Sequence, residues 1–252
     1  MSSQKVIIIQ TSDGVRYKPM MDITEALHRK YCQRWGYEYR RFDGIKRGFK
    51  PWHAAFNRIY MVLELLAEGT YDWILHMDAD GVIVDIHKSL SEYLDPGFAL
   101  VACRGSTDDP NVTWNVNNGI MFINARHPDT RAIFEIWKRL YENVKDDVLQ
   151  GEPEGIFMDC SKHVNDQDML CLILFQERFR KAAKIYRGEQ HNAFNYGGPF
   201  IRQIIRGLNN TTESRIDEIR RLVTEILGKE DKLPNKEKEN NSRPTIHKRS
   251  IL

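Results

Sequence analysis

Short apolar runs alternate with longer amphipathic stretches through most of the chain. Runs with the length and composition of strands are found at residues 6–9, 37–42, 73–77, 98–103, 117–124 and 183–186. Stretches with apolar side chains at helical spacing are found at residues 23–35, 53–67, 128–144 and 169–179. Because strand and helix patterns alternate, the sequence predicts an α/β domain with a parallel sheet flanked by helices.

The pattern changes after Gly207, where charged residues become frequent. Residues 213–227 keep an amphipathic helical pattern, but the sequence beyond them has too few apolar residues to form a core of its own. We therefore expect a single folded domain over residues 1–207, a peripheral helix over residues 208–228, and a charged, mostly disordered tail over residues 229–252.

Two carboxylates follow the apolar run that starts at Trp73. Asp78-Ala79-Asp80 comes directly after this run, and a second apolar segment begins at Val82. The carboxyl ends of strands in an α/β sheet form the edge where ligands bind. Two hard oxygen ligands in so short a span suit Mg²⁺ or Mn²⁺ bound together with the phosphates of a substrate. Asp and Gly are also ordinary turn residues, so the motif could simply end a strand.

Composition narrows the class of protein. With 252 residues and 41% hydrophobic content, the chain is long enough for one well-buried domain. The net charge of +2, with both signs interspersed, argues against nucleic-acid binding. The sequence contains no apolar segment long enough for a signal peptide or a transmembrane helix, so we expect a cytoplasmic protein. Its slightly basic tail could contact anionic lipid at a membrane surface, although a solvated tail is favoured.

The cysteines support the same compartment. Their scattered positions fit reduced structural thiols better than a zinc site. They are Cys32, Cys103, Cys160 and Cys171. The sequence also contains neither of the glycine-rich motifs typical of dinucleotide-binding and P-loop proteins. A nucleotide would therefore have to be bound by other residues.

Further polar residues lie beside the predicted elements. Thr11, Ser12 and Asp13 follow the first strand and could bind a base or ribose, or could serve as turn and helix-capping residues. Arg58 lies at the edge of the apolar stripe of its helix. Its guanidinium could reach a phosphate, or its chain could lie along the core with the charge in solvent.

The segment Asn165-Asp166-Gln167-Asp168 begins a predicted helix. Asn or Asp at such a position is a typical helix cap, but a cap requires only one residue of this kind. We therefore expect at least one of Asp166, Gln167 and Asp168 to face a ligand.

The acidic motif resembles the signatures of two families. In haloacid-dehalogenase-type phosphatases the first aspartate is the nucleophile and the second a general acid. In GT-A glycosyltransferases the D-x-D pair binds a divalent ion and a nucleotide-sugar. The phosphatase motif lies near the N-terminus of its domain, whereas two βα units precede Asp78 here. We retain the phosphatase as an alternative.

Four motifs in order resemble the GT-A nucleotide-sugar glycosyltransferases. They are Phe56-Asn57-Arg58-Ile59, Met77-Asp78-Ala79-Asp80, the strand from Asn117 to Asn124, and Asn165-Asp166-Gln167-Asp168. The order is most similar to the galactosyl-, xylosyl- and mannosyltransferases of plants and fungi, and more distantly to the glycogenin-like group. The resemblance covers about Val6 to Gly207.

The resemblance implies a donor site on one side of the domain. Asp78 and Asp80 would hold Mn²⁺ or Mg²⁺ against the diphosphate of the donor. Arg58 and Ala79, together with the Thr11–Asp13 segment, would contribute to donor binding. Many relatives supply a third metal ligand as a histidine. His191 is the candidate here, since in Phe200-Ile201-Arg202-Gln203 a glutamine stands where a histidine could be expected.

The resemblance also implies a sugar and acceptor side. Asn117, Asn118 and Gln167 would contact the sugar or the acceptor. Asp166, Asp168 and Asn118 are the candidate catalytic residues, and in an inverting enzyme one of the two acids would also deprotonate the acceptor hydroxyl. The relatives favour retention of configuration.

The predicted function is transfer of a hexose or pentose from a nucleoside diphosphate, with UDP favoured, to a hydroxyl group of a glycan or glycoconjugate. The alternatives are the phosphatase, with Asp78 as its nucleophile, and a catalytically inactive nucleotide-sugar-binding protein.

Overall fold

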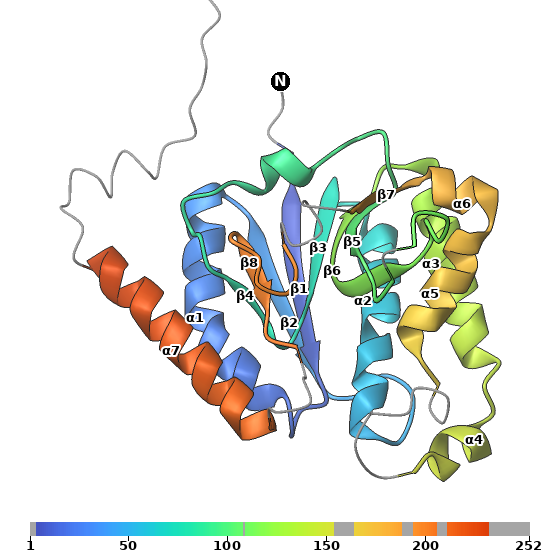
Figure 1. Ribbon diagram of the computed structural model, residues 1–252, viewed down its shortest axis with the longest axis horizontal. Coiled ribbons are helices and arrows are strands. Elements are labelled where there is room, and N and C mark those ends of the chain that lie inside the picture. Colours follow the sequence, from blue (N-terminus) through green and yellow to red (C-terminus); the bar gives the residue numbers. More distant parts are fainter. Residues whose placement is uncertain (1–3, 108, 154–163, 188–193, 206–210, 232–252) are drawn as a thin grey trace, which may run out of the picture.

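A six-stranded sheet forms the centre of the protein (Figure 1). The computed structural model describes residues 4–107, 109–153, 164–187, 194–205 and 211–231. The strands run in the order β2-β1-β3-β6-β5-β7. Their bounds are β1 Val6–Ser12, β2 Glu38–Asp43, β3 Trp73–Asp78, β5 Leu100–Arg104, β6 Val116–Asn124 and β7 Ala183–Tyr186. The predicted α/β class and the mostly parallel sheet are confirmed.

One strand of this sheet runs against the others. β6 is antiparallel to both of its neighbours, β3 and β5, whereas all the other pairs are parallel. Only the loop of residues 105–115 joins β5 to β6. A parallel return normally needs a crossover of a dozen or more residues, usually including a helix, so this short loop brings the chain back in the opposite direction.

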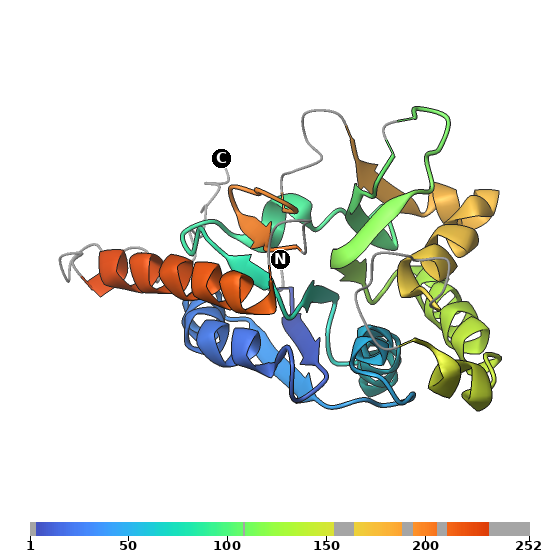
Figure 2. The same cartoon turned by 60° about the horizontal axis from the view of Figure 1, so that its bottom comes forward.

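Helices cover both faces of the sheet. Their bounds are α1 Lys18–Trp35, α2 Asn57–Glu68, α3 Pro128–Glu142, α4 Asp146–Gly151, α5 Asp166–Phe175, α6 Glu177–Lys181 and α7 Thr212–Asp231. Figures 1 and 2 show α1 and α7 side by side on one face, and α2, α3 and α5 on the other. Short 3-10 helices span Pro51–Phe56 and Leu90–Tyr93.

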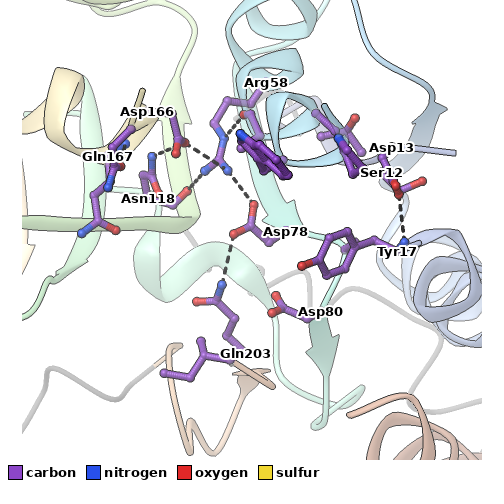
Figure 3. Close-up of a pocket in the computed structure, with 18 of the residues that line it drawn as sticks. Ser12, Asp13, Tyr17, Arg58, Asp78, Asp80, Asn118, Asp166, Gln167 and Gln203 are labelled. Carbon is purple, nitrogen blue, oxygen red and sulfur yellow. Dashed lines mark hydrogen bonds and ion pairs between the residues drawn. The ribbon is translucent and has the colours of Figure 1, made fainter. Parts of the chain in front are cut away.

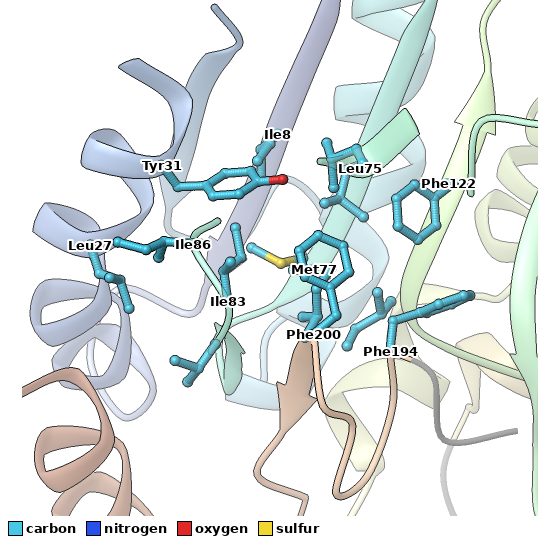
Figure 4. Close-up of a cluster of buried hydrophobic side chains, with 14 of the residues drawn as sticks. Ile8, Leu27, Tyr31, Leu75, Met77, Ile83, Ile86, Phe122, Phe194 and Phe200 are labelled. Atoms are coloured by element: carbon cyan, nitrogen blue, oxygen red, sulfur yellow. The ribbon is translucent and has the colours of Figure 1, made fainter. Parts of the chain in front are cut away.

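Successive residues of the central strands point to opposite faces, as the two-residue period of a strand requires. In β1, Val6 and Ile8 pack on the side of α1 and α7, whereas Ile7 and Ile9 pack on the side of α2 and α3. Figure 4 shows the cluster of buried apolar side chains on the side of α1 and α7, in which Ile8 lies among side chains of α1, β3 and β6. Because both faces are covered, β1 is buried along its whole length.

Several helix boundaries differ from the prediction. α1 begins at Lys18 instead of residue 23, with Pro19 in the first turn, where proline is favoured. The helix predicted over residues 53–67 begins as the 3-10 helix Pro51–Phe56, and its α-helical part starts at Asn57. The helix predicted over residues 169–179 is broken into α5 and α6 because Gln176 has an extended conformation.

A small second sheet brings the C-terminal part of the domain to the acidic motif. β4 (Gly81–Ile83) pairs in an antiparallel manner with β8 (Ile201–Gln203), a strand that the sequence pattern did not predict. In this pairing Gly81 lies opposite Gln203. The residue after β8, Ile204, donates its amide to the carbonyl of Asp80 at 3.0 Å. β8 therefore reaches the position directly beside Asp80.

α7 is fixed to the domain along its length. Ile219, Leu222 and Val223 are buried in the cluster shared with α1 and β1. Towards the end of the helix, the buried carboxylate of Glu230 lies 2.9 Å from the guanidinium of Arg34 in α1. The helix predicted over residues 213–227 therefore forms, extends to Asp231 and packs on α1. The predicted division into domain, peripheral helix and tail stays a prediction.

Two further features bear on the predicted compartment. Within the described part of the chain, every helix is too short or too polar to cross a bilayer. The described cysteines, Cys32, Cys103 and Cys171, are free thiols. The cytoplasmic location stays a prediction, as does weak contact of the tail with a membrane.

The core on the α3 side can be tested at Trp137, which is fully buried and whose indole nitrogen has no hydrogen-bond partner among the described residues. Trp137→Ala should lower the free energy of unfolding by about 3–5 kcal/mol because it leaves a large cavity. Trp137→Phe gives up no hydrogen bond and should cost far less, about 1–2 kcal/mol. Urea unfolding followed by circular dichroism measures both. Equal losses in the two variants would contradict the packing described for α3.

Candidate functional site

A cavity of about 570 Å³ lies at the carboxyl ends of β1 and β3 (Figure 3). Its volume is within the range of sites that bind small molecules and cofactors. The polar and aromatic residues that line it are Thr11, Ser12, Asp13, Tyr17, Trp52, Arg58, Asp78, Asp80, Asn118, Asn165, Asp166, Gln167, Gln203 and Arg215. They come from β1, the 3-10 helix at residues 51–56, α2, the β3–β4 turn, β6, α5, β8 and α7.

The two aspartates of the acidic motif are paired with arginines from different helices. Asp78 receives a hydrogen bond from Arg58 of α2, with 2.7 Å between Oδ1 and Nη2. Asp80, after the end of β3, is paired through Oδ2 with Nη2 of Arg215 in α7. The short motif therefore connects helices that cover opposite faces of the sheet.

Arg58 forms the centre of a larger polar network. Its side chain is only 2% exposed. Nε donates to the carbonyl of Ala55 at 2.7 Å, and Nη1 donates to the carbonyl of Asn118. Nη2 also lies 3.3 Å from Oδ2 of Asp166. The alternative in which Arg58 extends its charge into solvent is therefore wrong, because the guanidinium is buried at the wall of the cavity.

The start of α5 combines a helix cap with cavity-lining groups. Asn165 is the cap, since its Oδ1 accepts the backbone amide of Gln167 at 2.9 Å. Asp166 accepts a hydrogen bond from Asn118 Nδ2 at 2.6 Å, and both Asp166 and Gln167 line the cavity. Asp168 is exposed and is not among the lining residues. The side-chain carboxamide of Asn165 therefore supplies the cap, and the side chains of Asp166 and Gln167 are left to contact a ligand.

The other predicted asparagine has a different role. Asn117 donates from Nδ2 to Asn195 Oδ1 at 3.1 Å, and its own Oδ1 accepts the amide of Gly119 at 2.8 Å. The contact with Asn195 ties β6 to the segment that leads into β8. Asn117 does not line the cavity, whereas Asn118 does.

The residues after β1 line the cavity but are already engaged with the protein. Asp13 accepts the backbone amides of Arg16 and Tyr17 at 3.0 and 2.8 Å, which is the turn role considered for it, since both amides precede the first residue of α1. Ser12 donates to Asp43 at 2.6 Å, and Thr11 accepts from Asn57 Nδ2 at 2.8 Å. A ligand at this end would therefore meet polar groups that are held in fixed positions.

Gln203 of β8 completes the acidic end of the cavity. Its side-chain nitrogen donates to Asp78 Oδ2 at 3.1 Å. The residue is 5% exposed, and its Oε1 is buried without a hydrogen-bond partner among the residues that the structure describes. Oδ1 of Asp80 is in the same condition. Buried polar atoms are nearly always hydrogen-bonded, so two such oxygens in one cavity indicate a missing partner.

Burial also changes the charge state of the acidic pair. It raises the pKa of Asp78 to about 7, although the nearby positive charge of Arg58 acts in the opposite direction. Burial raises the pKa of Asp80 as well, and there Arg215 opposes the shift. An added cation would favour the ionised form of both carboxylates.

The oxygens of Asp78, Asp80 and Gln203 fit a divalent metal ion. They are hard donors of the kind that Mg²⁺ and Mn²⁺ prefer, and the two unpartnered oxygens belong to this set. The described residues contain no cluster of three His, Cys, Asp or Glu side chains that could hold a metal. His191, the predicted third ligand, lies outside the described residues, so its role stays a prediction.

The structure adds lining residues that the sequence analysis did not place in the site, among them Tyr17, Trp52, Gln203 and Arg215. The indole nitrogen of Trp52 donates a hydrogen bond to the buried carboxylate of Glu152, and this bond fixes the orientation of the ring. For Gln203 the sequence contained a weak signal, because a histidine that binds the metal was expected near this position. Arg215 had none, since its partner Asp80 is 135 residues away along the chain.

No protein-family model matches the sequence, and no curated protein matches it. Solved structures do resemble the fold. A glycosyltransferase involved in the glycosylation of the major capsid of PBCV-1 is similar over 85% of this chain and 98% of its own, with 13% identity and a TM-score of 0.57. The glycosyltransferase GlyE of Streptococcus pneumoniae TIGR4 is similar over 93% of this chain and 66% of its own, with 16% identity and a TM-score of 0.50. The chain therefore has a single-domain GT-A fold, as predicted.

The raised pKa of Asp78 has a consequence for stability without metal. A carboxyl whose pKa is higher in the folded than in the unfolded protein binds protons more strongly in the folded state. Its contribution to stability is therefore lost as the pH rises from about 4 to about 7. Asp78→Asn removes this titration. The wild-type free energy of unfolding minus that of the variant should fall as the pH is raised through this range.

Urea unfolding of both proteins at intervals between pH 4 and pH 8, in the presence of a chelator, measures this difference. A difference that stays constant or increases with pH would contradict the burial of Asp78 described above.

Proposed function

We propose that the protein is a metal-dependent glycosyltransferase that moves a hexose or pentose from a nucleoside diphosphate to a hydroxyl group of a glycan or glycoconjugate. The observation that carries the proposal is the arrangement of the cavity (Figure 3). The acidic pair lies in the middle, the polar end of β1 lies on one side, and Asn118, Asp166 and Gln167 lie on the other. A nucleotide-sugar has the same order of parts, with a diphosphate between a nucleoside and a sugar.

Each part of the donor has a matching group in the cavity. The nucleoside is assigned to Thr11, Ser12 and Asp13, and the diphosphate to the metal and Arg58. Asp78 and Asp80, with the turn residue Ala79 between them, would hold Mn²⁺ or Mg²⁺. The ion would offset the charge that grows on the nucleoside diphosphate as it leaves.

The charges of the cavity support a requirement for metal. Its charged residues are the carboxylates of Asp13, Asp78, Asp80 and Asp166 and the guanidiniums of Arg58 and Arg215. With all four carboxylates ionised, the net charge of these residues is −2, which one divalent cation would neutralise. A diphosphate is itself an anion, so it would be repelled unless a cation entered with it.

The sugar end is assigned to Asn118, Asp166 and Gln167. Asp166 accepts a hydrogen bond from Asn118 and lies close to Arg58, so its carboxylate is in a fixed position to orient sugar hydroxyls. Asp168 and Asn117 lie outside the cavity and are less suited to this role. UDP as the carrier and retention as the stereochemical outcome rest on the sequence resemblance.

The two alternatives predict different behaviour. A phosphatase would hydrolyse phosphomonoesters through a phosphorylated Asp78, but Asp78 is held by Arg58 and Gln203 at the end of the third strand. An inactive relative would bind the nucleotide with metal but transfer nothing. The fold, which this chain shares with glycosyltransferases, supports sugar transfer over hydrolysis.

Thermal unfolding with UDP, GDP and their common sugars, each with Mn²⁺ or with chelator, tests the proposal. A ligand at 100 times its Kd should stabilise the folded protein by about 2.7 kcal/mol, which raises the melting temperature by several degrees. The shift should require Mn²⁺ and should be absent in Asp80→Asn. The conservative exposed substitution Asp217→Asn in α7 is the control.

Incubation of wild-type protein with each stabilising nucleotide-sugar should then release the nucleoside diphosphate, and should do so faster when a suitable acceptor is present. Binding without release would favour the inactive relative. Hydrolysis of p-nitrophenyl phosphate without any effect of nucleotides would favour the phosphatase.

Gly119 offers a test of Gln203 in the metal site. A Cβ atom at Gly119 would lie 2.3 Å from Gln203 Nε2, so alanine would push the carboxamide away from Asp78. Gly119→Ala should destabilise the fold by about 1–3 kcal/mol and weaken Mn²⁺ binding several-fold. Gly151→Ala is the matched control, since no described residue lies within 4 Å of its Cβ position. The signal of free Mn²⁺ in electron paramagnetic resonance measures binding, and unchanged affinity in Gly119→Ala would exclude Gln203 as a ligand.

A further inference from the structure

Arg215 is the residue through which α7 enters the cavity. Its side chain is 4% exposed, and it is paired with Asp80, the second aspartate of the acidic motif. Its Nε donates to the carbonyl of Ile204 at 2.7 Å. The amide of Ile204 in turn donates to the carbonyl of Asp80 at 3.0 Å. The guanidinium therefore has a fixed position between β8 and the β3–β4 turn.

A buried ion pair of this kind needs an explanation beyond stability. Removing two charges from water costs about as much as their attraction returns, so apolar residues would fix α7 equally well. α7 already has apolar anchors in Ile219, Leu222 and Val223, and a polar anchor in Glu230 towards its end. Within the described part of the chain, Asp80 also keeps one buried oxygen, Oδ1, without a hydrogen-bond partner. The pair therefore leaves Asp80 incompletely satisfied.

The position of Arg215 conflicts with a metal ion on Asp80. A divalent ion and a guanidinium repel each other, and both would use the same carboxylate. The conflict is removed if an anion enters with the metal, because the guanidinium then has a new partner. A guanidinium has five N–H donors in a fork, and this geometry suits phosphate oxygens. Its bond to Ile204 can persist while Nη2 changes partner.

We propose that Arg215 is a donor-binding residue that exchanges Asp80 for the diphosphate of the donor when the divalent ion takes the Asp80 carboxylate. This inference rests on the proposed function and adds α7 to the donor site. It makes Mn²⁺ and the nucleoside diphosphate bind cooperatively. Without the nucleotide, Mn²⁺ on Oδ1 of Asp80 must bind against the positive charge of Arg215 on Oδ2, whereas with the nucleotide the guanidinium moves to the diphosphate and stabilises the complex.

The exchange predicts effects of opposite sign when Arg215 is changed to Gln. Mn²⁺ alone should bind several-fold more tightly, because no cation competes for Asp80. UDP in saturating Mn²⁺ should bind about 10- to 100-fold more weakly, because a hydrogen bond to a charged group has been lost. The factor by which UDP strengthens Mn²⁺ binding should therefore shrink. A residue that only held α7 in place would weaken both ligands together.

Electron paramagnetic resonance of free Mn²⁺ measures the first affinity, and isothermal titration calorimetry of UDP in Mn²⁺ measures the second. Arg220→Gln is the matched control. It makes the same chemical change in the same helix, but Arg220 is exposed and pairs with Asp217 three residues away. Its two affinities should equal those of the wild type.

Arg215→Lys covers the case in which Arg215→Gln fails to fold. It keeps the positive charge, but an ammonium group cannot hold Ile204 and reach a second acceptor in the same fork geometry. Both affinities should then move in the same directions as in Arg215→Gln, by smaller factors. Circular dichroism melting shows which variants are folded.

The outcomes separate this inference from the proposed function. If the wild type binds UDP with Mn²⁺ and the folded Arg215 variants match Arg220→Gln, or weaken Mn²⁺ and UDP alike, the exchange is wrong and the donor site stands. If the wild type binds no nucleoside diphosphate in Mn²⁺, both fail together.

Discussion

The close approach of two carboxylates at one end of β3, with Asp80 buried and Asp78 partly buried, is the constraint on which the site depends. Asp78 and Asp80 leave the centre of the sheet within three residues, and each is balanced by an arginine from a different helix. Two such charges could not be buried alone. The positions of α2 and α7 are therefore coupled to the acidic motif, and through it to each other across the sheet.

The same balance explains why the cavity suits a metal and a diphosphate together. The arginines reduce the negative charge of the cavity without removing it, and two oxygens, on Asp80 and Gln203, keep unfilled hydrogen-bonding capacity. A cation satisfies the oxygens, and an anion then satisfies the arginines. β8 and α7 matter here because they deliver Gln203 and Arg215 to this point, which neither the sheet nor α2 could do.

The sequence predicted the features that depend on short stretches of chain. The apolar run of β3 and the acidic pair after it are local patterns, so the α/β class and the Asp78–Asp80 position at the strand end could be predicted. The antiparallel direction of β6 was not predicted, because the strand pattern does not encode direction and only the short connection from β5 indicates it. Arg215 is on a helix whose stripe indicates only that it packs, and its contact with Asp80 spans 135 residues. Gln203 is on a strand of three residues, too short to give a pattern.

The central claim is that this carboxylate pair holds a divalent ion against a nucleoside diphosphate. Crystals grown with Mn²⁺ and UDP, with anomalous scattering measured near the manganese absorption edge, test it most directly. The account predicts one strong peak about 2.0–2.6 Å from oxygens of Asp78 and Asp80, with the diphosphate bound to the same ion. UDP bound in the cavity with no ion at this pair, or manganese only at other sites, would contradict it.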